Sequence, residues 1–130
     1  MALIQFSSVA AGPFIMFKET AEEIFKTISE PFPPRGAWGT DDLKEVLRRL
    51  DEAQARDKAE AQAREAELEA MKRASFTGDS ATLQREEELA KLIKENEARI
   101  NFYQRVVPLQ NMIRRAIKHD KPVMWETLGG

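Results

Sequence analysis

The stretch MALIQFSSVAAGPFIMF, residues Met1–Phe17, decides how this chain folds, because it is long, apolar and free of charged side chains. We compare three interpretations of this stretch: a signal peptide, a membrane anchor and the buried strands of a domain. A signal peptide begins with a basic segment, and none precedes these apolar residues. A membrane helix needs about 20 apolar residues. This stretch is shorter and carries Gly12 and Pro13 near its middle.

Two short strands account for the stretch better. Leu3–Phe6 is rich in β-prone residues, as is Phe14–Phe17, and small residues ending in Gly-Pro separate the two runs. Pro13 cannot donate a backbone hydrogen bond, so it belongs at the start of the second strand or at an edge. We therefore predict two strands, with a helical second run as the alternative. Large apolar residues of this kind are expected in the core rather than in an exposed docking strip, as are those near the other end; they are Met16, Phe17, Met124 and Trp125.

Amphipathic helices are predicted after these strands. Apolar residues recur at spacings of three and four between Lys18 and Ile28, which predicts a helix there. Three prolines between residues 31 and 34 end it, and we expect Phe32 and Trp38 to fold back onto the core. Thr40 is the predicted N-cap of the next helix, whose apolar stripe runs to Leu50.

The composition of the middle of the chain predicts two long helices. About 35 residues from Asp41 to Ser75 are strong helix formers and would span roughly 50 Å at about 1.5 Å per residue. Gly78 is the predicted turn, and a second helix continues to Arg99. We thus expect a charged, coiled-coil-like antiparallel hairpin over residues 51–99, whose tip projects into solvent or packs on another chain.

A further helix and a strand are predicted after the hairpin. Apolar residues lie on one helical face between Phe102 and Ile117. Pro108 is expected too far inside for a first-turn proline, which predicts a kink, although a break near Asn101 is also compatible with the pattern. Val123–Trp125 is a predicted short strand.

Composition excludes several kinds of chemistry. The chain has 130 residues, a formal net charge of -2, no cysteine and one histidine. Disulfides, cysteine nucleophiles and histidine-pair metal sites are therefore excluded. His119, Asp120 and Lys121 form the one titratable cluster of interest, and a solvated helix end explains it. We expect no enzyme activity and no cofactor, and the net charge argues against nucleic acid or an anionic membrane as partner.

Short segments near both ends resemble a bacterial family labelled domain of unknown function 1840. They are LIQFSS, FIMF, GAWGTDDLKEVLRRL, YQRVVPLQNMI and PVMWE, at residues 3–8, 14–17, 36–50, 103–113 and 122–126. The resemblance implies a small bacterial, cytoplasmic protein and carries over no catalytic residue. It also implies that the strands near Leu3, Phe14 and Met124 pair in one sheet. Residues 51–99 depart from the family pattern.

The predicted fold is therefore α+β, in one domain over residues 1–130. A sheet of about three strands, formed by both chain ends and packed by helices, makes a compact core from residues 1–50 and 100–128. The helical hairpin at 51–99 is inserted between them. A three-stranded sheet with packed helices is stable where an isolated two-stranded hairpin is marginal.

The predicted function is that of a non-enzymatic interaction or structural protein acting through the hairpin. The partner is another protein or a second copy of the chain, and a homo-oligomer is expected. The candidate surface comprises Ala59, Ala63, Ala66, Leu68, Ala70, Met71, Leu89 and Ile93. The alternative is nucleic-acid or nucleotide binding by a basic patch on the last helix, formed by Arg114, Arg115, Lys118 and Lys121.

Overall fold

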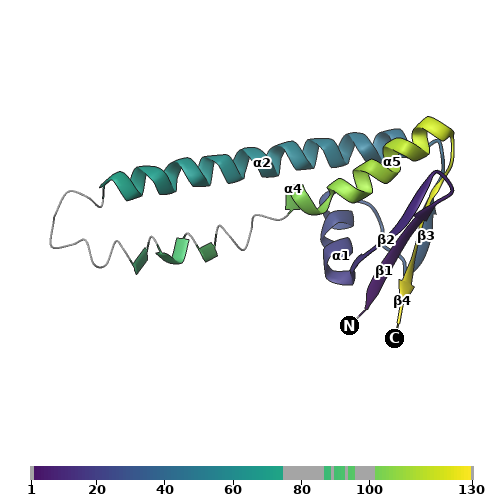
Figure 1. The fold of residues 1–130 in the computed structure, drawn as a ribbon, viewed down its shortest axis with the longest axis horizontal. Coiled ribbons are helices and arrows are strands. Elements are labelled where there is room, and N and C mark those ends of the chain that lie inside the picture. Colours follow the sequence, from purple (N-terminus) through teal and green to yellow (C-terminus); the bar gives the residue numbers. More distant parts are fainter. Residues whose placement is uncertain (1, 75–86, 89, 93, 96–101, 130) are drawn as a thin grey trace. The chain divides into compact units, whose positions relative to one another are not determined.

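The computed structural model of the protein describes residues 2–74, 87, 88, 90–92, 94, 95 and 102–129. The chain forms two compact units: unit 1 contains Met1–Gln54 and Arg105–Gly130, and unit 2 contains Ala55–Gln104. The elements in chain order are β1 (Leu3–Ser8), β2 (Ala11–Phe17), α1 (Lys18–Thr27), β3 (Arg35–Trp38), α2 (Leu43–Ala74), α4 (Phe102–Arg105), α5 (Val107–His119) and β4 (Val123–Leu128) (Figure 1).

Unit 1 is built on one antiparallel sheet with the strand order β2-β1-β4-β3. Phe6 in β1 lies opposite Phe14 in β2 and opposite Trp125 in β4, so segments more than a hundred residues apart are neighbours. The predicted strands near Leu3, Phe14 and Met124 are confirmed, and so is their pairing in one sheet. The sheet nevertheless has four strands and not about three.

The fourth strand, β3, was missed because it directly follows the proline-rich segment that ends α1. Prolines lack the N–H that a central strand needs, and β3 is only four residues long at a sheet edge. The proline carbonyls are still used. Pro33 accepts a hydrogen bond from the Trp125 indole at 3.1 Å, and Pro34 accepts one from the Thr127 hydroxyl at 2.8 Å.

The core of unit 1 lies between the sheet and helices α1 and α5, which lie on the same side of it (Figure 1). Ile4 and Phe6 of β1 and Val123 of β4 are fully buried. The Phe25 ring from α1 is central to an aromatic cluster whose other members are Phe6, Phe14, Phe32, Trp38 and Trp125. The expected return of Phe32 and Trp38 to the core is confirmed.

The first two helices lie where the sequence predicts them, except that α2 begins later than expected. Helix α1 buries Ala21, Ile24 and Phe25, as their spacing predicts. Helix α2 begins at Leu43, where the Asp42 carbonyl accepts the first helical hydrogen bond, from Val46. The predicted N-cap, Thr40, is therefore wrong, and Asp42 takes that position two residues later. The Asp42 N–H donates to the Gly39 carbonyl in a turn that precedes the helix.

Helices α4 and α5 are separated at Val106, a position where no break was predicted. Pro108 is in the first turn of α5 and does not lie too far inside for that position, contrary to prediction. The reason is that α5 restarts at Val107, and a proline near a helix start has no hydrogen bond to lose. The alternative break near Asn101 lies outside the described residues.

Unit 2 contains the later part of α2. The helix continues to Ala74, as predicted, while the proposed turn at Gly78 lies outside the described residues. The hairpin is therefore not shown, although residues 87, 88, 90–92, 94 and 95 are helical. Asp57 of α2 accepts a hydrogen bond from the Tyr103 backbone N–H at 3.1 Å, which caps the start of α4 within this unit.

Candidate interaction surfaces

The described part of the chain contains no group of three or more His, Asp or Glu residues that could hold a metal ion. His119 is exposed on the last turn of α5. Hydrogen bonds from Arg48, and then from Arg49, lower the pKa of the Glu45 carboxyl to about 2. These three side chains form an exposed ion-pair group on α2, which explains the shift without any catalytic role.

The predicted alanine surface lies on the exposed side of α2 in unit 2. Ala59, Ala63, Ala66 and Ala70 are all exposed. Leu68 is buried, and at about 100° per residue it lies on the opposite side of the helix. The alanines and Leu68 therefore do not form one surface. Leu89 and Ile93 lie outside the described residues.

The buried side of α2 in unit 2 is narrow and consists of few apolar residues. Ala61 and Leu68 are buried there, and Met71 is partly exposed. A small open hollow is lined by Arg64, Glu67, Leu68, Met71 and Leu92. Leu68 and Met71 thus lie close to another segment of the same chain, whereas the alanine side contacts solvent.

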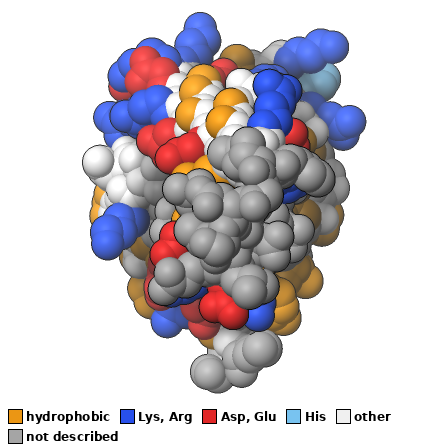
Figure 2. All heavy atoms as spheres, turned by 90° about the vertical axis from the view of Figure 1, so that its left-hand side faces the viewer, with side chains coloured by type: hydrophobic (Ala, Val, Ile, Leu, Met, Phe, Trp, Pro, Cys, Tyr) orange, Lys and Arg blue, Asp and Glu red, His pale blue; other side chains and the backbone are white. Residues whose placement is uncertain are grey.

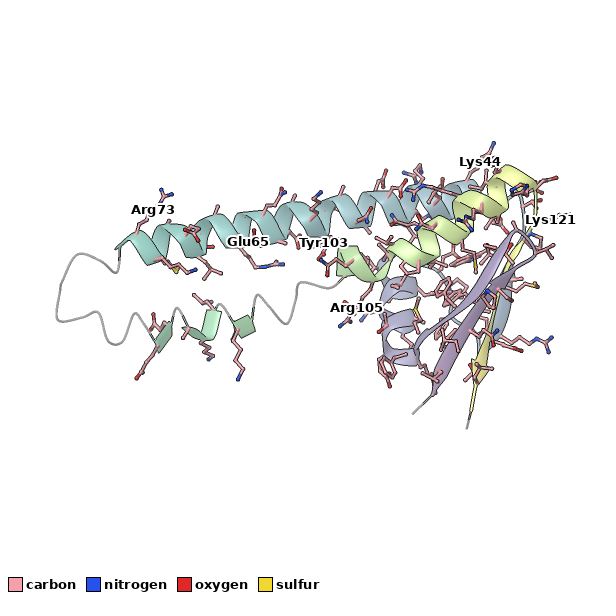
Figure 3. The ribbon with its side chains drawn as sticks, in the orientation of Figure 1. Lys44, Glu65, Arg73, Tyr103, Arg105 and Lys121 are labelled. Atoms are coloured by element: carbon pink, nitrogen blue, oxygen red, sulfur yellow. The ribbon has the colours of Figure 1, made fainter. Side chains whose placement is uncertain are left out.

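The basic side chains at the end of α5 differ in whether they form an ion pair. Arg114 donates to the Asp51 carboxylate at 3.0 Å and is partly neutralised. Arg115, Lys118 and Lys121 are exposed and form no ion pair with any residue of the described ranges. Lys44, from the first turn of α2, projects outward at the same end of unit 1 as Lys121 (Figure 3). Sequence reasoning missed Lys44 because it is far away along the chain.

A buried polar group connects α5 to α2 within unit 1. The Gln110 side-chain amide, almost fully buried, donates to Asp51 at 2.8 Å and to Gln54 at 2.9 Å. Asp51 also accepts from Arg114. Because buried polar groups stabilise only when they are satisfied, this cluster selects one register of α5 against α2.

Replacing Gln110 by alanine should therefore destabilise the protein. We expect Gln110→Ala to lower the free energy of unfolding by about 1–3 kcal/mol, since it removes two hydrogen bonds and leaves a cavity. Urea denaturation followed by circular dichroism measures this. Asn111→Ala is the matched control, because Asn111 is the exposed next residue of the same helix. An equal loss in both variants would contradict a stabilising role for the buried amide.

The sheet of unit 1 carries large apolar residues on the face that α1 and α5 do not cover. Ile15 is 54% exposed, Phe17 52% and Met124 38%. The prediction that Phe17 and Met124 are core residues is wrong, whereas Trp125 is buried as predicted. Consecutive residues of a strand point to opposite faces, so only one residue of each pair can enter the core.

The comparison with known proteins identifies a family without an assigned activity. The family model described as domain of unknown function 1840 matches residues 2–125. No curated protein and no solved structure matches the chain significantly. Among the described helices, none is both long and apolar enough to cross a membrane.

Proposed function

The chain belongs to the family described as domain of unknown function 1840, and we propose that it is a non-enzymatic interaction protein acting through the outer part of α2. The single observation that carries this proposal is the exposed alanine stripe, formed by Ala59, Ala63, Ala66 and Ala70. In Figure 2 small hydrophobic side chains lie between acidic and basic ones at the top of the face shown.

The stripe is suited to contact with another helix. Alanine side chains are short, so a partner helix can approach α2 closely along this side. The helix buries few of its own apolar residues in unit 2. A long helix that is polar all round connects domains through solvent or is stabilised by ion pairs along its own surface, so its exposed side is free for contact with a partner. The simplest partner is a second copy of the chain, packed helix to helix in a coiled-coil-like manner.

The proposed place of action is the bacterial cytoplasm. The family resemblance noted in the sequence implies it, and a chain without cysteine suits a reducing compartment.

A double substitution on the stripe tests the proposal. Ala63→Glu with Ala66→Glu places two carboxylates on the contact side, so self-association should weaken by about tenfold or more. Light scattering over a range of protein concentrations measures the particle mass. Lys58→Glu is the matched control, because it changes the net charge by the same two units on another side of α2. Equal masses for the double variant and the unmodified protein would overturn the self-association form of the proposal.

Anion or nucleic-acid binding at the end of α5 is the second candidate. It is favoured by the exposed side chains of Arg115, Lys118 and Lys121. Two observations make it the weaker one: Asp51 pairs with Arg114, and Asp120 lies within the basic group. Its binding would fall steeply with salt, unlike helix-to-helix contact.

A further inference from the structure

We infer that the uncovered face of the sheet in unit 1 packs face to face against the same face of a second copy, in a weak two-fold dimer. This surface is separate from the alanine stripe of α2 and independent of it. We call it the open sheet face. Across β2, β1, β4 and β3 it contains Ile15, Phe17, Leu3, Gln5, Ser7, Met124, Glu126, Leu128, Arg35 and Ala37.

The open sheet face carries more apolar side chains than is usual for a sheet face that contacts only water. Antiparallel sheets with one wet face usually alternate apolar residues inward with polar residues outward. Here Phe17, Leu3 and Leu128 lie in register across three strands and form a continuous apolar row. Exposed apolar patches rimmed by polar side chains mark contact surfaces.

The charges of this face are balanced, and they form no ion pair within the part of the chain that the structure describes. Glu126 lies in register between Gln5 on β1 and Arg35 on β3. Among the described residues, none of these three side chains forms a hydrogen bond or ion pair. The face thus presents one carboxylate, one guanidinium and one amide outward, with zero net charge, which permits contact with an identical face.

The register of the strands indicates which direction the two-fold axis takes. An axis perpendicular to the strands through this row would place Glu126 against Glu126 and Arg35 against Arg35, which costs energy. An axis parallel to the strands, between β1 and β4, places Gln5 of each copy against Glu126 of the other. It also places Leu3 against Leu128 and Ser7 against Met124, and it leaves Arg35, on the edge strand, opposite Ile15. Two sheets stacked this way keep their strands aligned within about 30°, as in β-sandwiches.

The size of the face predicts a weak dimer. Four strands about 4.8 Å apart, with six residues at about 3.3 Å each, cover roughly 400 Å². A standard stable interface buries about 800 Å² per partner. We therefore expect a concentration-dependent equilibrium between monomer and dimer rather than a permanent dimer.

Sedimentation equilibrium of the full chain, from about 10 μM to about 1 mM, tests this inference. Leu128→Asp with Met124→Asp should raise the dissociation constant by at least tenfold, which corresponds to about 1.4 kcal/mol, because each substitution places a carboxylate opposite an uncharged side chain of the other copy. Val9→Asp is the control, because Val9 is 80% exposed in the turn between β1 and β2, off this face. An unmodified protein that stays monomeric at 1 mM, or an equal effect of the control, would overturn the inference.

A mixing experiment tests the pairing itself. Chains with Gln5→Glu should dimerise poorly, because two carboxylates then face each other at both contacts. Mixing them with chains that carry Glu126→Lys should give more dimer than the two variants give separately, because the new glutamate of one chain faces the new lysine of the other. Since the two substitutions are on different chains, no contact within one chain explains such a rescue. No recovery on mixing would overturn the proposed axis and with it the inference.

The two surfaces can fail separately. If only Ala63→Glu with Ala66→Glu reduces the mass, α2 alone joins the copies and the inference about the open sheet face is overturned. If only the variants of the open sheet face reduce it, the inference holds and the self-association proposed for α2 fails. A loss in both sets, each partial, supports both surfaces.

Discussion

Replacing Phe25 by alanine should lower the free energy of unfolding by about 3–5 kcal/mol. Phe25 is fully buried on α1. Its ring lies 4.9 Å from each tryptophan ring, Trp38 and Trp125, and 4.6 Å from Phe32. These neighbours are held on two strands and a loop and cannot all move inward, so the substitution leaves a cavity as well as losing apolar burial. Small domains have only about 5–15 kcal/mol of stability, so much of it would be lost.

Phe17→Ala is the control for this prediction, since it removes the same side chain from a half-exposed position. It should cost about 1 kcal/mol or less. Urea denaturation at a protein concentration of a few micromolar, followed by tryptophan fluorescence, compares the two variants. Trp38 and Trp125 both lie beside Phe25, so this signal reports on the same cluster. Similar losses in both variants would show that Phe25 is not central to the core.

Adding one methyl group at Gly36 should also destabilise unit 1, by about 2 kcal/mol or more. A Cβ atom at this position would overlap the Trp125 ring, with Cζ2 nearest and Cε2 at 2.9 Å. The Trp125 ring cannot easily move away, because its N–H donates to the Pro33 carbonyl and the ring lies against those of Phe25 and Trp38. Overpacking of this kind typically costs about 1–3 kcal/mol.

Gly12→Ala provides the contrast, because no atom lies within 4 Å of a Cβ built there. The control should be neutral or stabilise by up to about 1 kcal/mol, since alanine restricts the unfolded chain. Thermal unfolding by differential scanning calorimetry compares the two glycine variants. If Gly36→Ala kept the melting temperature of the unmodified protein, the close approach of β3 to the Trp125 ring would be wrong.

The sequence predicts unit 1 well where the signal is local. The spacing of Ala21, Ile24 and Phe25 specifies α1 without help from the rest of the chain. The strands near Leu3 and Phe14 follow from two β-prone runs separated by small residues, although the turn lies at Val9 and Ala10, and Gly12 and Pro13 belong to β2. The kind of element is set in these cases by neighbours within a few residues, which periodicity detects.

Prediction from the sequence fails where contacts with residues far away in the chain determine the structure. β3 forms because Gly36 fits against Trp125, some ninety residues later, and nothing local in the proline-rich segment indicates it. The exposure of Phe17 depends on which face of the sheet the helices cover. On α2 the alanine spacing and the position of Leu68 on the opposite side both follow from helix geometry, but only the structure shows that the side with Leu68 is the buried one. The position of Lys44 at the same end of unit 1 as Lys121 likewise requires the fold.

The central pairing of β1 with β4 has a consequence for how the protein is made. Phe6 lies opposite both Phe14 and Trp125, so β1 can pair with β2 early but cannot pair with β4 until most of the chain has left the ribosome. Helix α2 needs only local contacts and can form much earlier. Closing so long a loop slows the search for the native state and leaves apolar β1 and β2 exposed meanwhile. A nascent chain stalled before Val123 should therefore be a good client for chaperones that bind short apolar segments.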